Sequence, residues 1–347
     1  MLYLRILAAP VGLWLIFITI SAAIRSFVLP RNETVRLNVG IYSGIRLVFD
    51  LVARSARNYA QRDRVLAHYA PVALVALPIC WEALVGLGYT GIYWALGEGN
   101  WGACYRMSSS YLLTLGTDKL HGTAAVALGY SEASLGLLLL TLLLSYLPTI
   151  YQAFSRREVT VARLELRAGT PATAVALLVW LHRNGALDND AAQWADWEQW
   201  FVEIEESHTS LPILTFFRSP QPGRSWVTAG GLVLDAANLL FSALDTAHGR
   251  QVELTFKAGC LALNRVYRFF DLKVGSEPSA LLPDNDPLEA PGRADFLAAC
   301  DELAAAGLPL CPDRAAAWQH YLDRRQRYAP ATEFLARLTM APDSKPV

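Results

Sequence analysis

The chain has few cysteines, and neither they nor its histidines have the spacings that usually give these residues a chemical role. Its six histidines are scattered, and its five cysteines, which form no CxxC pair, are Cys80, Cys104, Cys260, Cys300 and Cys311. These absences argue against a disulfide scaffold and against a metal site. No nucleophile beside a general base is recognisable either. The sequence therefore predicts a protein that is not an enzyme and carries no cofactor.

Charge is also scarce, because charged residues make up 18% of the 347 residues and hydrophobic residues 53%. The first 159 residues hold 13 lysines and arginines against 8 acidic residues, whereas the remainder holds 17 against 23. A basic, apolar half followed by an acidic half indicates a membrane part and a soluble part. The sequence has no glycine-rich nucleotide fingerprint and no regular arginine repeat of a voltage sensor, and we expect no nucleic-acid partner.

Long apolar runs, in contrast, are plentiful. Three of them, at about 5–29, 68–96 and 122–154, reach the roughly 20 residues that a membrane-spanning helix needs. The first run is longer than the apolar core of a signal peptide, so we expect a membrane anchor there. The sequence thus predicts three transmembrane helices.

Arginines predict how these helices are oriented. The 31–66 connection contains seven arginines and three acidic residues, and positively charged connections stay on the cytoplasmic side. Leu37, Ile41, Ile45, Val48 and Val52 recur there at helical spacing, which predicts an amphipathic helix along the inner membrane surface. That helix either couples the soluble part to the membrane part or docks on the protein's own tail. We expect the inner (plasma) membrane, with the C-terminus in the cytoplasm.

The segment between the second and third spans, residues 100–120, has the features of a loop that enters a membrane and returns. Cys104 to Leu113 is long enough for a short helix, and the five residues that follow it include a glycine, which allows backbone angles that other residues resist: Thr114, Leu115, Gly116, Thr117 and Asp118. Non-helical backbone at membrane depth must be buried in protein or line a water-filled path. Its carbonyl oxygens can then replace the water around an ion.

These five residues, together with their flanking spans, resemble the tetrameric potassium-channel superfamily, a class of pore-loop cation channels. The filter of that family usually reads Thr-Val-Gly-Tyr-Gly-Asp. Thr114 matches its threonine, Leu115 its valine and Gly116 its first glycine, while Thr117 stands at the aromatic and Asp118 at the closing acid. The second glycine has no counterpart. The resemblance implies the bacterial two-helix-plus-pore type with an extra N-terminal span, a homotetramer and a transported monovalent cation, with K⁺ as the expected ion.

Two further sets of residues are candidates within the spans. Gly129, Gly136 and Pro148 on the third span either form a gate or hinge or permit close helix packing. Glu82 and Glu132 are carboxylates inside spans, where an ionisable group is costly enough to indicate a role. Glu132 is expected either to hold the back of the loop or to lie nearer the membrane surface, and Glu82 either to pair with Arg106 or to stay protonated.

From residue 156 onward the periodicity is helical throughout. Helices are expected near 160–185, 190–209, 226–249, 251–272, 293–306 and 313–338. The apolar run Trp226 to Leu244 contains Asp235 and Asn238, so we expect a buried core helix instead of a fourth span. Trp194, Trp197 and Trp200 share one helical face, which predicts core or inter-subunit packing, or a partner-binding face.

The sequence therefore predicts an all-α membrane protein with three transmembrane helices, a re-entrant pore loop and a C-terminal all-helical cytoplasmic domain. Its parts are an N-terminal span (1–30), an amphipathic helix (31–66), a pore domain (67–155) and a helical domain (156–347). We expect a cation channel with membrane lipid and three further copies of the chain as partners. The alternative is a membrane-anchored scaffold or sensor whose helical domain binds a partner.

Overall fold

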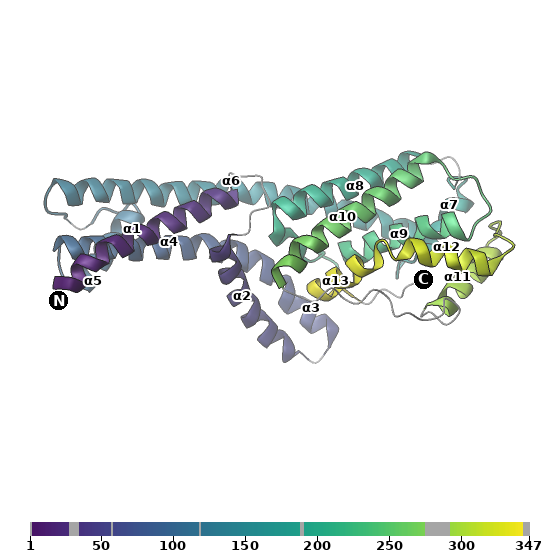
Figure 1. The fold of residues 1–347 in the computed structure, drawn as a ribbon, viewed down its shortest axis with the longest axis horizontal. Helices are drawn as coiled ribbons and strands as arrows, with labels where there is room; N and C mark the ends of the chain where they lie inside the picture. Colours follow the sequence, from purple (N-terminus) through teal and green to yellow (C-terminus); the bar gives the residue numbers. More distant parts are fainter. Residues whose placement is uncertain are drawn as a thin grey trace. The chain divides into compact units, whose positions relative to one another are not determined.

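The computed structural model describes residues 2–27, 35–56, 58–117, 119–187, 191–274 and 292–342, and within these ranges the chain is helical, without a strand. A single antiparallel bridge joins Leu244 and Leu310. The chain divides into two compact units, Met1–Tyr151 and Gln152–Val347. One helix, α6 (Thr123–Ala168), begins in the first unit and ends in the second (Figure 1). The all-helical prediction is thereby confirmed.

Three helices are long and apolar enough to cross a membrane. They are α1 (Leu2–Phe27), α4 (Tyr69–Leu96) and α6, whose candidate spans are Tyr3–Ser26, Ala60–Leu96 and Thr123–Ala168. The first of these helices packs along the second through glycines, because a Cβ on Gly12 would collide with the carbonyl oxygen of Gly88. A Cβ on Gly91 would likewise lie 3.1 Å from the carbonyl oxygen of Ala8. Small residues thus bring the backbones of α1 and α4 together, as in other membrane helix pairs.

The predicted amphipathic helix is two helices, α2 (Arg36–Arg54) and α3 (Tyr59–Ala67). The break falls where Asn58 caps α3, since its side chain accepts a hydrogen bond from the Gln61 amide at 2.9 Å. Four apolar side chains on α2 are more than half exposed: Leu47, Val48, Leu51 and Val52. At the other end of α2, the buried Asn38 accepts a hydrogen bond from the Trp81 indole and donates one to Ser26, which ties α2 to α4 and α1.

The second unit contains the end of α6 and the helices that follow it. These are α7 (Ala174–Arg183), α8 (Ala191–Ser210), the 3₁₀ turn η1 (Pro212–Phe216), α9 (Trp226–Ser242), α10 (Arg250–Val274), α11 (Arg293–Ala305), α12 (Arg314–Arg325) and α13 (Ala329–Thr339). Two expected helices are interrupted. The 160–185 run stops at Gly169, whose φ of +79° ends α6, and the 313–338 run divides near Arg325. The proline-rich stretch before residue 292 lies outside the described residues.

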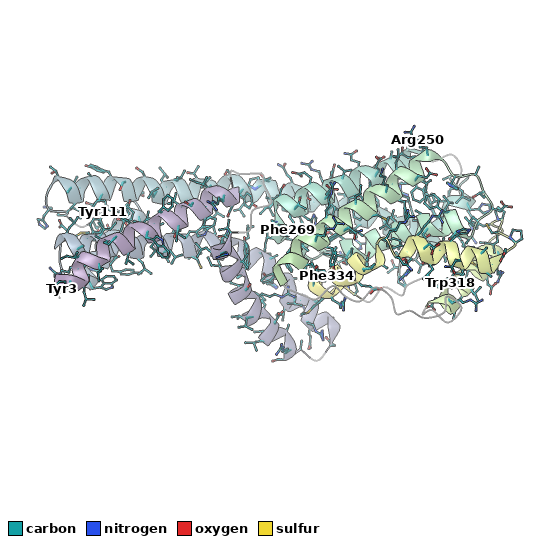
Figure 2. The ribbon with its side chains drawn as sticks, viewed as in Figure 1. Tyr3, Tyr111, Arg250, Phe269, Trp318 and Phe334 are labelled. Atoms are coloured by element: carbon teal, nitrogen blue, oxygen red, sulfur yellow. The ribbon has the colours of Figure 1, made fainter. Side chains whose placement is uncertain are left out.

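Aromatic side chains fill the core of this unit. Trp194, Trp197 and Trp200 are at most 3% exposed, which confirms core packing for that cluster. Phe334 on α13 packs against Tyr267 on α10, with ring centres 4.9 Å apart (Figure 2). Most of α9 is buried as well, as expected for a core helix.

The charge inside α9 is neutralised within the same core. Arg325 on α12 donates a hydrogen bond to the Asp235 carboxylate at 3.1 Å, and the Tyr328 hydroxyl donates another at 2.5 Å. Burial and the adjacent Asp235 charge raise the pKa of Tyr328 well above its ordinary value, so this phenol stays a hydrogen-bond donor. Asp235 thus joins α9 to α12 instead of facing lipid or water.

The last part of α6 is fixed in the second unit by Arg157, which is 3% exposed. Its guanidinium donates hydrogen bonds to the Leu214 carbonyl at 2.9 Å, to the Phe217 carbonyl at 2.7 Å and to Nε2 of His208 at 3.2 Å. The same group lies 5.7 Å from the centre of the Trp226 ring. One buried arginine therefore connects α6 with α8, η1 and α9.

Candidate functional site

The candidate site is the short helix α5 (Trp101–Leu112) and the loop that follows it, and it lies between α4 and α6 of the first unit. Asn100 begins α5, since its side chain accepts a hydrogen bond from the Ala103 amide at 2.8 Å. The predicted short helix from Cys104 is therefore present and begins three residues earlier. On α5, Cys104, Met107 and Leu112 belong to the buried core of the first unit, together with Trp81, Val85 and Tyr93 of α4.

Contacts between α5 and α6 show where along α6 the helix α5 ends. Tyr111 lies beside Gly129, where a Cβ would be 3.0 Å from the tyrosine ring, and a Cβ on Gly136 would collide with the carbonyl oxygen of Leu112. Gly136 is 13 residues after the start of α6. At a rise of about 1.5 Å per residue, α5 ends roughly 20 Å along α6. The packing alternative that the sequence left open accounts for both glycines.

Glu132 lies in the middle of this packing and is completely buried. Its Oε2 atom accepts a hydrogen bond from the Tyr93 hydroxyl of α4 at 2.9 Å, and its Oε1 atom lies 2.5 Å from the Ser108 hydroxyl of α5. A second link joins the Tyr89 and Ser131 hydroxyls at 2.8 Å. We call Glu132, Tyr93 and Ser108 the carboxyl brace. It connects α4, α5 and α6, whereas Ser108 and Tyr93 gave no signal in the sequence.

The protons of the carboxyl brace can be counted. Ser108 has one hydroxyl hydrogen but two oxygen neighbours, Glu132 Oε1 and the Gly86 carbonyl oxygen at 2.8 Å. Both contacts become hydrogen bonds if the Glu132 carboxyl is protonated, because it then donates to Ser108, which donates to Gly86. A protonated carboxyl also avoids the cost of a buried charge between apolar helices. The geometry therefore favours a neutral Glu132.

The loop after α5 differs from the extended return that the sequence predicted. Thr114 and Gly116 both have φ of +59°, and the amides of Leu115 and Gly116 both donate to the carbonyl oxygen of Ser110. The Ser110 hydroxyl accepts from the Thr117 amide at 2.8 Å. A tight turn results, because a carbonyl group at the end of α5 that has no partner within the helix accepts hydrogen bonds from the amides that follow it in the chain. Ser110, which sequence reasoning missed, is the residue that shapes it.

The turn also presents backbone oxygens that accept no hydrogen bond from a described backbone amide. Between described residues, no backbone amide donates to the carbonyl oxygen of Thr114, Leu115 or Gly116. These residues are exposed in the single chain, and the Leu115 side chain is 66% exposed. Three carbonyl dipoles are thus available to a ligand at this level of the helices. Asp118, the fifth predicted filter residue, lies outside the described residues.

The far end of the loop is joined to the end of α4. Glu98, just after α4, accepts a hydrogen bond from the His121 amide at 3.1 Å, and its Oε2 atom lies 3.2 Å from His121 Nδ1. The loop therefore begins beside the first third of α6 and ends beside the C-terminus of α4. Both of its ends are fixed by side chains of the first unit.

Other predicted residues are placed differently. Glu82 is half-buried on α4 and forms no ion pair with Arg106, which is exposed on α5. Pro148 lies inside α6, which continues through it as one helix. No group of histidine, cysteine and acidic residues able to hold a metal ion occurs in the part of the chain that the structure describes.

Comparisons with protein-family models, with curated proteins and with solved structures find no match to this chain. The function must therefore be argued from the geometry.

Proposed function

We propose that the protein is a homotetrameric cation channel whose pore loop is formed by residues 114–118, as the resemblance to potassium channels implies. One observation carries this proposal. The turn after α5 exposes non-helical backbone at the level of Gly136, roughly 20 Å along an apolar helix. If α6 enters hydrocarbon about 30 Å thick near its first residues, this level would lie deep inside the membrane, where such backbone must line water or be covered by protein.

The second support is the exposed surface of α6. Large apolar side chains on this helix are uncovered in the single chain, among them Tyr130, Leu137, Leu140 and Leu144, each at least 47% exposed. Lipid and neighbouring copies of the chain would share this surface. One loop cannot enclose an axis, so a closed ring of four copies is the simplest arrangement. The carbonyl oxygens of Thr114, Leu115 and Gly116 would then face the axis and coordinate a monovalent cation.

In this proposal the carboxyl brace holds the pore helix. A neutral Glu132 fixes α5 to α4 and α6 without placing a charge beside the permeating ion. By the same proposal, the arginine-rich connection, α2, α3 and the helical second unit would lie in the cytoplasm of a cell with this protein in its inner (plasma) membrane. The exposed Leu47, Val48, Leu51 and Val52 of α2 would rest on the inner membrane surface.

Ion flux into liposomes tests this function. Wild-type protein is expected to pass K⁺, and the Na⁺ and chloride gradients measure its selectivity. Gly116→Val should abolish the flux, because the left-handed conformation costs a side chain roughly 1–2 kcal/mol and the turn would rearrange. Gly185→Val is a matched control, since Gly185 has φ of +65° and, like Gly116, has open space where a Cβ would be.

Each result has a defined meaning. Flux lost with Gly116→Val and retained with Gly185→Val supports a pore at the loop. Wild-type flux from both variants contradicts the assignment of residues 114–118. A monomer that passes no ion would overturn the channel and support the membrane-anchored scaffold or sensor.

A further inference from the structure

Three buried polar atoms without a hydrogen-bond partner surround one hollow in the second unit. They are Oγ1 of Thr215, Oγ of Ser219 and Nε of Arg224. The hollow lies at the start of α9, where the chain after η1 meets the end of α13, and it has a volume of about 280 Å³ including space open to solvent. We call it the α9 hollow.

The buried hydroxyl of Thr215 is the main evidence that the hollow binds a ligand. The residue is 1% exposed, and its carbonyl oxygen accepts a hydrogen bond from the Trp226 indole at 3.3 Å, but its hydroxyl has no partner. A buried polar group without a partner costs about 1–3 kcal/mol, so folded proteins rarely leave one unsatisfied. Three such groups lining one hollow indicate a ligand that accepts hydrogen bonds.

The charged side chains around the hollow indicate the charge of that ligand. Arg218 and Arg224 both line it, and one carboxylate, Glu165, pairs with Arg224. Arg218 is held in position by the end of α13, because it donates to the carbonyl oxygens of Thr339 at 2.6 Å and Met340 at 3.0 Å. Ser225 and Trp226 bring the N-terminus of the 17-residue helix α9 to the same place. Two guanidiniums and a helix N-terminus favour an anion.

We propose that the α9 hollow binds a phosphate oxyanion, through the Thr215 and Ser219 hydroxyls, the Arg224 guanidinium and the start of α9. Phosphate supplies several acceptor oxygens on one centre, which matches donors arriving from three segments. A metal cation is opposed by the two arginines. The shared chemistry is a phosphate group, whether it is free, part of a soluble metabolite or part of a lipid headgroup.

The hollow shares residues with the anchor of α6. Phe217 and Trp226 line the hollow, and Arg157 of α6 donates to the Phe217 carbonyl and lies over the Trp226 ring. Binding at the hollow therefore acts on the helix that, in the proposed channel, lines the pore. This regulatory step rests on the proposed function, whereas the binding site itself does not.

Equilibrium dialysis of the purified full-length protein against radiolabelled inorganic phosphate tests the site. We expect saturable binding of one phosphate per chain, competed by sulfate and not by chloride at the same ionic strength. Repeating the measurement in detergent without phospholipid and in phosphatidylglycerol nanodiscs at the same ionic strength separates the sources. Weaker phosphate binding in the anionic nanodisc identifies a lipid headgroup as the occupant, and equal binding identifies a free phosphate.

Two variants and a control make the test specific. Arg224→Gln should weaken phosphate binding at least tenfold, because a charged hydrogen bond is lost. Arg314→Gln is the control, since Arg314 also pairs with a carboxylate, Asp301, but lies on α12. Thr215→Val should weaken binding while keeping or raising the stability of the empty protein, because it removes a buried hydroxyl that has no partner.

Absence of saturable binding, or equal binding by wild type and both hollow variants, would overturn the site and leave water as its content. Flux is measured separately on the same proteins. Phosphate that binds but leaves ion flux unchanged contradicts the regulatory step. Phosphate that binds to a protein without ion flux contradicts the channel and leaves the site standing.

Discussion

At the scale of single residues, the carboxyl brace shows what a buried glutamate can do without a charge. A proton on Glu132 allows every hydrogen bond around Ser108 to form at once, and a carboxylate does not. The sequence identified Glu132 because acids are rare in spans, but it could not identify Ser108 and Tyr93. These partners are 24 and 39 residues away along the chain, and only helix packing brings them together.

Glu132→Gln should therefore preserve the brace. The glutamine amide can donate to Ser108 and its oxygen can accept from Tyr93, as a protonated carboxyl does. Glu132→Ala should lower the stability of the first unit by about 1–3 kcal/mol for each hydroxyl left unpaired, and flux should fall with it. Thermal unfolding in detergent and liposome flux measure both effects. A Glu132→Gln protein as damaged as Glu132→Ala would show that the carboxylate charge is required.

His208 is a buried histidine of the second unit whose pKa is altered by its surroundings. Burial, and next the positive charge of Arg157, lower its pKa well below the ordinary value of 6.5. Arg157 donates to Nε2, and Nδ1 lies 3.0 Å from the Ile204 carbonyl oxygen, which is the pattern of a neutral ring. The unfolded chain therefore takes up a proton at a higher pH than the folded chain does.

The consequence for stability has a definite sign. The contribution of His208 to the free energy of unfolding of the second unit should be constant above pH 6.5. As the pH falls below 6.5, this free energy of unfolding should decrease. Urea unfolding followed by tryptophan fluorescence at several pH values measures this dependence. His208→Gln should flatten it, while His320→Gln, which changes an exposed histidine of α12, should not. An unchanged slope in His208→Gln would show that another group titrates.

At the scale of elements, the glycines of α6 determine where α5 lies. Gly136→Ala should displace the end of α5, because the new Cβ would collide with the Leu112 carbonyl oxygen. We expect a loss of about 1–3 kcal/mol in stability, as for overpacking in a core, together with loss of flux. Gly44→Ala on α2 has open space for its Cβ and should stabilise its helix by about 1 kcal/mol. Thermal unfolding of the two variants compares these effects, and equal unfolding temperatures would contradict the close approach.

Most helices could be predicted from the sequence, and the exceptions have physical reasons. Apolar runs and their period locate the three long helices and most helices of the second unit, because burial follows hydrophobicity. The 313–338 run divides near Arg325, because Pro330 in the first turn of α13 cannot continue the preceding helix and the Tyr328 side chain turns to meet Asp235. The turn after α5 was missed for a similar reason, since Ser110 satisfies the following amides and closes the loop on itself.

At the scale of the whole molecule, the proposal requires four chains. Mixing wild-type and Gly116→Val subunits should reduce flux far below the fraction of wild-type protein, because one altered loop disables a shared axis. The mass of the purified protein in nanodiscs checks the number of copies independently. Flux that falls in simple proportion to the wild-type fraction would show that each chain acts alone.

The backbone of Thr114 has a consequence at this same scale. A β-branched residue at a φ of +59° is held against its own preference, at a cost of order 1–3 kcal/mol. In the proposed ring of four copies, that cost would apply four times around one axis, where the four loops would meet. The four loops would then hold this strained turn together. If the backbone of one loop relaxed to an extended conformation, the same change in the others would be favoured. Opening and closing of the filter would be a concerted, switch-like transition instead of four independent ones.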